Sequence, residues 1–164
     1  MTMHLLEAFN PIVGRTAFVG LFLPEPWRLS RAVVTPDVQT TVREGEQQWV
    51  ASGETRHVLV HGVRRTERAD LMVRVTPGAA RRPLASRVGA ESGALTVGGH
   101  PGEFHLGRRR DGWFTARMVP VVRVRTYCPR TRRTVLLEVT GQLPPEELRA
   151  LLDAFQRIAC HSGP

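Results

Sequence analysis

Lysine is absent from this chain of 164 residues, and all 23 basic side chains are arginine. This absence excludes enzymes that form a Schiff base on lysine and phosphate-binding loops of the GxxxxGK[ST] type. Aromatic residues are scarce, at 6%, with a single tyrosine. No apolar run reaches the roughly 20 residues of a membrane-spanning helix, and the start at Met1–His4 lacks the basic and apolar regions of a secretory signal. We therefore expect a cytoplasmic protein without membrane contact.

Catalytic motifs are also missing. There is no GxSxG nucleophile motif, and no glycine-rich segment precedes the predicted helix as a phosphate cradle would. The adjacent carboxylates Glu146 and Glu147 are explained by a helix start, where the helix dipole favours negative charge. We predict no catalytic residues and no cofactor, and hence a protein that is not an enzyme.

The residues from 56 onward carry the alternation typical of β-strands. Leu71, Val73 and Val75 alternate with more polar or longer side chains, as in a half-buried strand. The same period recurs on either side of a predicted turn at 129–132. These patterns predict an antiparallel sheet built mostly from hairpins.

A helix is predicted over residues 145–160. Pro145 suits the first helical position. Six apolar side chains recur at helical spacing on one stripe: Leu148, Leu151, Leu152, Phe155, Ile158 and Ala159. The predicted fold class is α+β, with an antiparallel sheet of about six to eight strands, mostly a meander, covered on one face by this C-terminal amphipathic helix.

A single domain over residues 1–164 is expected from the length. Residues 1–55 are predicted to be less regular and slightly acidic, with four arginines against six carboxylates, a net charge of −2. Residues 56–164 are predicted to form the basic sheet and the helix, with 19 arginines against nine carboxylates, a net charge of +10. This asymmetry indicates an anionic partner or, alternatively, an arginine coat that serves solubility.

Three arginine clusters, at 64–68, 108–110 and 130–133, are predicted to lie in turns. Two further arginines and Tyr127 are predicted on the open face of the sheet, where guanidinium groups and a ring can contact phosphate and base. The candidate residues for binding an anion or a partner are Arg64, Arg65, Arg68, Arg108, Arg109, Arg110, Arg123, Arg125, Tyr127, Arg130, Arg132 and Arg133. We expect a binding or assembly protein with a protein partner; RNA or DNA binding is the alternative, and the sequence indicates no particular small-molecule ligand.

Six histidines raise the question of a metal site. His57 and His61 share a strand face but lie about 13 Å apart, too far to hold one ion. His100 is expected in a turn at 98–102, and His105 on the outward face of the next strand. No CxxC or HExxH spacing accompanies them, so surface histidines are predicted and no metal ligand is assigned.

Cys128 and Cys160 are predicted to lie close together. The strand after the turn at 129–132 runs about 25 Å and the helix about 22 Å, so a helix packed antiparallel returns its end to the turn. On a continuous helix Cys160 lies about 120° from Leu148, so it reaches the core only if the helix ends there. Three states stay open: a disulfide, two free core thiols, and a metal site with His161. The metal site ranks last, because adjacent Cys and His residues rarely share one ion and no fourth ligand is evident.

The order of these elements resembles the Mog1/PsbP-like domains. The resemblance rests on antiparallel strands, on the turn Gly98–Gly102 that opens a strand, and on a final hairpin followed by Leu151–Phe155, and it covers residues 16–160. It implies an α+β fold and a non-catalytic binding or assembly protein. It transfers no functional residue.

Overall fold

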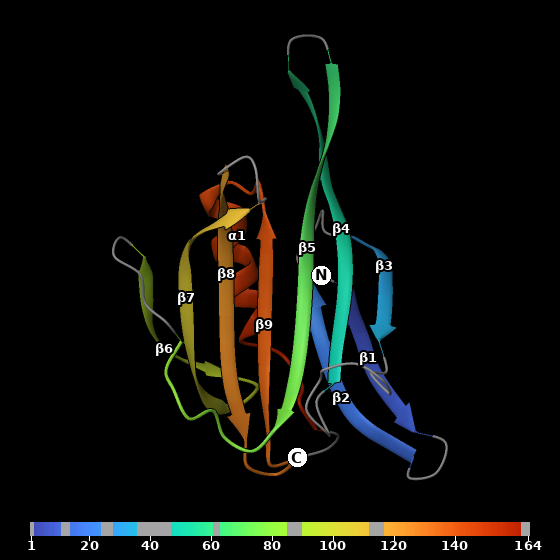
Figure 1. The fold of residues 1–164 in the computed structure, drawn as a ribbon, viewed down its shortest axis with the longest axis vertical. Helices are drawn as coiled ribbons and strands as arrows, with labels where there is room; N and C mark the ends of the chain where they lie inside the picture. Colours follow the sequence, from blue (N-terminus) through green and yellow to red (C-terminus); the bar gives the residue numbers. More distant parts are fainter. Residues whose placement is uncertain are drawn as a thin grey trace.

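The computed structural model describes residues 2–10, 14–23, 28–35, 47–60, 63–84, 90–111 and 117–161. The elements in chain order are β1 (Thr2–Asn10), β2 (Gly14–Leu23), β3 (Arg28–Thr35), β4 (Gln47–Val60), β5 (Val63–Pro77), β6 (Glu91–Val97), β7 (His100–Asp111), β8 (Arg117–Cys128), β9 (Arg133–Gly141) and α1 (Pro145–Phe155). A seven-stranded antiparallel sheet has the order β3-β4-β5-β9-β8-β7-β6, and β1 pairs with β2 separately (Figure 1). The predicted α+β class, dominated by an antiparallel sheet with one C-terminal helix, is confirmed.

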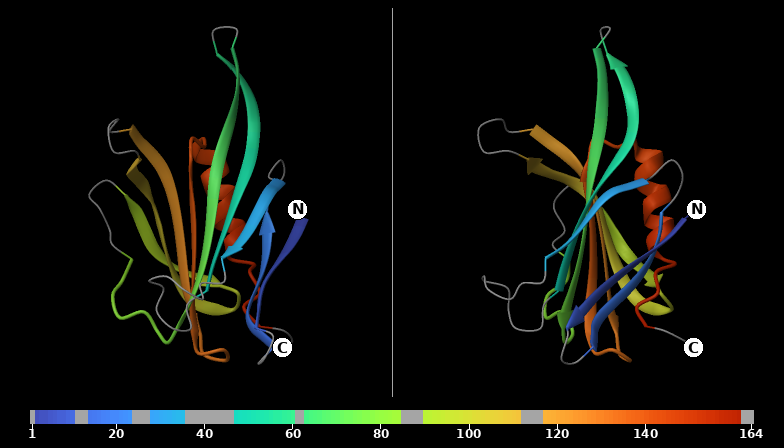
Figure 2. Two further views of the ribbon diagram at one scale, coloured as in Figure 1. Left: turned by 45° about the vertical axis from the view of Figure 1, so that its right-hand side comes forward. Right: turned by 90° about the vertical axis from the view of Figure 1, so that its right-hand side faces the viewer.

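The hydrophobic core lies on one face of the large sheet. Strand alternation directs Leu71, Leu137 and Val124 into it, and each of these residues is fully buried. Helix α1 adds Leu151 and Phe155, which are also fully buried. Helix α1 and the β1–β2 hairpin lie on the same side of the sheet (Figure 2). The C-terminal helix is therefore one part of this layer.

Strand β2 is a second part of that layer, and the apolar residues 16–23 predicted a strand there. Val19 and Leu21 on β2 are fully buried and belong to the same core cluster as α1. Residues 1–55, which were predicted to be less regular, contain β1, β2, β3 and the first part of β4. The prolines at 11, 24, 26 and 36 lie between these strands, in segments outside the described residues.

The helix is shorter than predicted. It ends at Phe155 instead of residue 160, because the chain turns over Gln156 and Arg157 and then pairs with β2. The N–H of Ala159 donates to the carbonyl oxygen of Gly20 at 2.9 Å, and the Gly20 N–H donates back to Ala159 at 2.8 Å. In the described part of the chain, no helix is long and apolar enough to cross a bilayer.

Two arginine clusters were predicted in turns and lie in strands instead. Residues 64–68 belong to β5, where they pair with β4, and residues 108–110 belong to β7, where they pair with β8. The segments 56–60 and 63–68 pair with each other and continue as a two-stranded ribbon beyond the seven-stranded sheet (Figure 1). The charged and polar residues at 64–68 have the composition of a turn, although they belong to a strand. The turn predicted at 129–132 is confirmed.

Candidate functional site

The open face of the sheet, opposite α1, carries paired charges. Arg123 on β8 and Glu138 on β9 are direct cross-strand partners, and the Nε of Arg123 donates to Glu138 Oε2 at 2.5 Å. Arg109 on β7 donates from Nη1 to Glu138 Oε1, also at 2.5 Å. The Glu138 side chain is only 8% exposed, against 42% for Arg109 and 30% for Arg123. One buried carboxylate thus neutralises part of the charge of two arginines.

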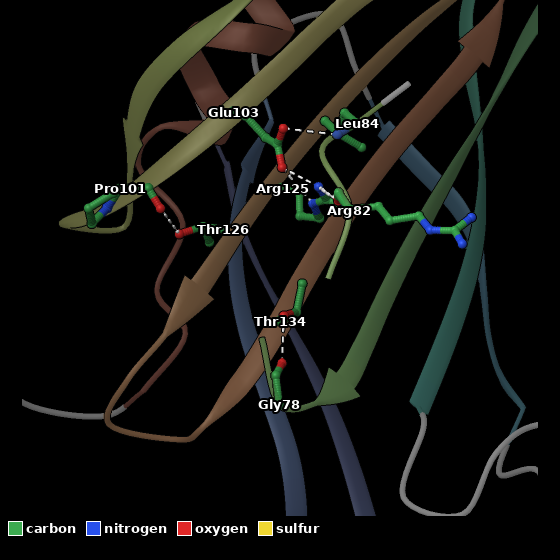
Figure 3. Close-up of polar contacts among 8 residues, drawn as sticks. All are labelled: Gly78, Arg82, Leu84, Pro101, Glu103, Arg125, Thr126 and Thr134. Atoms are coloured by element: carbon green, nitrogen blue, oxygen red, sulfur yellow. Dashed lines mark hydrogen bonds and ion pairs between the residues drawn. The ribbon is translucent and has the colours of Figure 1, made fainter. Parts of the chain in front are cut away.

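A strap formed by residues 78–84 crosses part of this face (Figure 3). At its start, the Thr134 hydroxyl donates to the Gly78 carbonyl oxygen at 2.7 Å. At its end, the Leu84 N–H donates to Glu103 Oε2 at 2.9 Å. Arg125 joins both sides, because its Nε donates to Glu103 Oε1 at 2.8 Å and its Nη2 donates to the Arg82 carbonyl oxygen. Arg125 is therefore held by the protein itself.

A hollow opens on the same face beside the strap. Three of its lining side chains are apolar and four are charged: Met72, Leu84 and Leu136, with Arg74, Arg109, Arg123 and Glu138. The hollow combines an apolar floor with a surplus of guanidinium groups. It can accept a ligand group that is partly apolar and partly anionic.

The twelve arginine and tyrosine candidates do not form one surface. Those on the open face are Arg109, Arg123, Arg125 and Tyr127. Those at the β8–β9 turn are Arg130, Arg132 and Arg133. Arg108 and Arg110 are exposed near the end of β7. Arg64, Arg65 and Arg68 lie in the β4–β5 ribbon, and their side chains are outside the described ones.

A second candidate site lies on the core side of the sheet, where His100, Cys128, Cys160 and His161 meet. One donor atom from each residue, a sulfur or a ring nitrogen, lies within 4.8 Å of the other three. His161 Nδ1 lies 3.4 Å from Cys128 Sγ and 3.4 Å from Cys160 Sγ. The rings of His100 and His161 are tilted at 44°, with centroids 5.5 Å apart. This Cys/His cluster is the densest group of soft donor atoms among the described residues.

Both sulfurs of the cluster are buried, and both cysteines are free. Cys128 is 0% exposed and Cys160 is 4% exposed. The two histidines are half-buried. The Nε2 atom of His100 is buried and has no hydrogen-bond partner among the described residues.

Three chain segments build the cluster. Cys128 is the last residue of β8, directly before the turn at 129–132. His100 opens β7 after a two-residue turn, because Val97 pairs directly with His100. Cys160 and His161 follow the β2 pairing of Ala159, at a bend in the chain. The bend allows two neighbouring side chains to point to the same side, which an extended strand does not permit.

Gly98 allows the turn before His100 to pack against the segment that follows α1. Its φ is +57°, in the region that favours glycine. Its N–H donates to the Gln156 carbonyl oxygen at 2.9 Å. A Cβ atom at this position would lie 2.7 Å from the Ile158 carbonyl oxygen. The close approach of the turn to residues 156–158 therefore requires glycine.

The two thiols have different pKa values, one below and one above the ordinary value. Burial by itself raises the pKa of Cys128, but hydrogen bonds from the Thr131 hydroxyl and N–H, from Cys160 and from the Arg130 N–H outweigh burial, so the pKa lies below its ordinary value. Burial, together with the hydrogen bond and the charge of Cys128, raises the pKa of Cys160 to about 12. Of the two thiols, Cys128 therefore loses its proton more readily.

Two histidines of β7, His100 in the cluster and His105 on the opposite face, differ from the prediction. His100 was expected in a turn at 98–102, but the turn is only Gly98 and Gly99, and His100 is already in β7. His105 was expected as a surface residue on the outward face; it shares the open face with its cross-strand partner Arg123, but it is buried, at 3% exposed, with its ring beside Gly107. The Gly-Gly pair, typical of a tight hairpin turn, was the available signal for the position of His100.

Comparison with protein-family models, with curated proteins and with solved structures gives no match to this chain. The resemblance to the Mog1/PsbP-like domains therefore stays a prediction.

Proposed function

We propose that this protein is a non-catalytic binding or assembly protein that contacts a protein partner through the open face of its sheet. The observation that carries the proposal is the hollow beside the strap, with Met72, Leu84 and Leu136 as apolar lining and three arginines around Glu138. Apolar contacts next to charges of both signs are typical of protein interfaces. The proposed role requires no catalytic residue, and the protein would act in the cytoplasm, where thiols stay reduced.

The pairing of the arginines favours a protein partner over a nucleic acid. Arg109 and Arg123 share Glu138, and Arg125 is paired with Glu103. A polyphosphate would have to compete with these carboxylates for each guanidinium group. A protein surface with an acidic residue beside an apolar one can join the existing network without displacing them.

Site-specific crosslinking tests this proposal. A photoreactive phenylalanine analogue replaces Leu136 in the hollow, and a matched control variant carries it at Asp153, which is exposed on α1. Irradiation in cells should give a discrete protein adduct at 136 that survives nuclease treatment, and no such adduct at 153. Equal labelling at both positions, or an adduct that nuclease removes, would contradict the proposal.

RNA or DNA binding, or association with a ribonucleoprotein, is the second candidate. The net charge of +8 and the exposed arginines at 130 and 132 favour it. Binding of this kind weakens steeply with salt, because released counterions set the slope. A fluorescence titration with mixed-sequence RNA and with duplex DNA, at low and physiological salt, measures it. No binding to either at low salt would exclude this candidate.

A further inference from the structure

We propose that His100, Cys128, Cys160 and His161 form a tetrahedral Zn²⁺ site that ties the end of the chain to two turns of the sheet. The site is independent of the binding surface proposed above, which lies on the opposite face. Two sulfurs and two imidazole nitrogens are a donor set that selects zinc among the common divalent ions. The proposal then depends on whether the four donors lie where one ion needs them.

The distances match a single tetrahedral ion. With Zn–S near 2.3 Å and Zn–N near 2.0–2.1 Å, a tetrahedral angle places a sulfur and a nitrogen about 3.5 Å apart. The two such distances at His161, from Nδ1 to Cys128 Sγ and to Cys160 Sγ, are both 3.4 Å. All four donor atoms lie within 4.8 Å of one another. One ion at the centre can therefore reach them with small side-chain adjustments.

The surroundings also suit a metal. Cys128 accepts hydrogen bonds from the backbone and hydroxyl of the turn at 129–132, and outer contacts of this kind orient and stabilise thiolate ligands. The Nε2 atom of His100 is buried with no hydrogen-bond partner in the described part of the chain. A buried polar atom without a partner is costly, and a bond to the ion would satisfy this nitrogen.

Two other uses of the cluster fit the geometry less well. A Cys–His nucleophile needs a thiolate that substrate can reach, and Cys128 is 0% exposed. A catalytic zinc keeps one position for water, whereas four protein donors fill the tetrahedron here. A disulfide between Cys128 and Cys160 would use both sulfurs and leave both histidines without a role. It is the competing state, and the experiment must distinguish it.

Cobalt binding tests the site, because Co²⁺ replaces Zn²⁺ and reports its own geometry. The reduced, metal-free protein is titrated with Co²⁺ and then with Zn²⁺. We expect one Co²⁺ per chain, intense visible bands of a tetrahedral ion, a thiolate-to-cobalt band in the near ultraviolet, and loss of both on adding Zn²⁺. Free-thiol titration of the protein isolated without reductant, denatured with chelator present, should count two thiols per chain.

Three variants assign the ligands. Cys128→Ser should remove half of the thiolate band, and His161→Ala should shift the visible bands; both should weaken cobalt binding by more than about 100-fold, since even outer-shell changes cost 10- to 100-fold. His57→Ala is the matched control, on β4 and separated from β8 by β5 and β9, and it should bind like the parent. The third ligand variant is His100→Ala, which is milder because His100 is only half-buried. Far-ultraviolet circular dichroism verifies that each variant folds.

Three results would overturn the proposal. The first is no cobalt binding by the reduced protein, or only the weak bands of an octahedral ion. The second is cobalt binding that His100→Ala and His161→Ala leave unchanged. The third is no free thiol in the protein isolated without reductant, which would assign a disulfide to Cys128 and Cys160.

Discussion

At the scale of the residue, the sequence predicts the position of some members of the Cys/His cluster and not of others. Lengths of strand and helix sufficed to predict that Cys128 and Cys160 approach each other, and all the cluster's donor atoms lie within 4.8 Å. His100 was not included, because its position depends on the turn at Gly98 and Gly99, whose contact with residues 156–158 has no local pattern. Cys160 and His161 converge only because the helix ends early.

Substituting Gly98 should cost more than substituting its neighbour. Both glycines have positive φ, +57° at Gly98 and +79° at Gly99, so each alanine variant carries about 1–2 kcal/mol of backbone strain. At Gly98 the new Cβ also meets the Ile158 carbonyl oxygen at 2.7 Å, whereas nothing lies within 4 Å at Gly99. Urea unfolding should show Gly98→Ala to be less stable than Gly99→Ala by a further 1–3 kcal/mol, roughly the cost of overpacking. Equal losses would mean that the contact is unimportant.

The shared carboxylate on the open face should matter more than an exposed one. Glu138→Gln removes the charge that Arg109 and Arg123 share in a partly buried place, and should destabilise the protein by about 1–3 kcal/mol. Glu91→Gln is the control, since its pair with Arg149 is exposed at 49% and 64% and should contribute under about 1 kcal/mol. Thermal unfolding of both variants measures the difference. A loss at Glu91 as large as at Glu138 would contradict this account.

At the scale of the element, the sequence predicted strands well where apolar residues alternate and poorly where arginines cluster, at 64–68 and 108–110. The β8–β9 hairpin has apolar residues on one face and a turn at 129–132, and both were predicted correctly. The ends of β4 and β5 pair only with each other, and the arginines there indicated a turn. Periodicity reports burial against a neighbouring layer. The charged run at 64–68 gives no such signal.

The pairing of β2 with the segment after α1 should respond to the metal. Zinc would fix Cys160 and His161, one and two residues after the Ala159 amide that bonds Gly20 at 2.9 Å. Chelation of zinc should therefore speed hydrogen exchange at the amides of Gly20, Gly98 and Ala159, as local opening becomes easier. The amide of Leu137, in central β9, serves as the internal control. Unchanged exchange at all of these amides after chelation would show that the site does not hold this segment.

At the scale of the whole molecule, zinc would join three segments that are far apart in the sequence. The β6–β7 turn, the β8–β9 turn and the end of the described chain meet at the Cys/His cluster. An ion that binds only the folded arrangement stabilises it by mass action. The proposed partner surface on the open face is a separate region, so loss of the metal should lower stability before it changes partner binding.

The stabilisation by zinc should depend on pH. Zinc binds thiolates and neutral imidazoles, so protons compete with it. Cys160, whose pKa is raised to about 12, must lose its proton when the metal binds, and this step alone lowers the affinity about tenfold for each pH unit of acidification. The rise in unfolding temperature on adding zinc should therefore shrink from about pH 8 to about pH 5. A zinc effect that is constant over this range would contradict thiolate ligation.

X-ray absorption at the zinc edge tests the central claim most directly. The fine structure reports the number, type and distance of the ligands around the ion in the reconstituted protein, without any substitution. The Cys/His cluster predicts two sulfurs near 2.3 Å and two nitrogens at about 2.0–2.1 Å, with the outer scattering of two imidazole rings. A shell of oxygen and nitrogen alone, or a coordination number of six, would place the ion elsewhere and contradict the account.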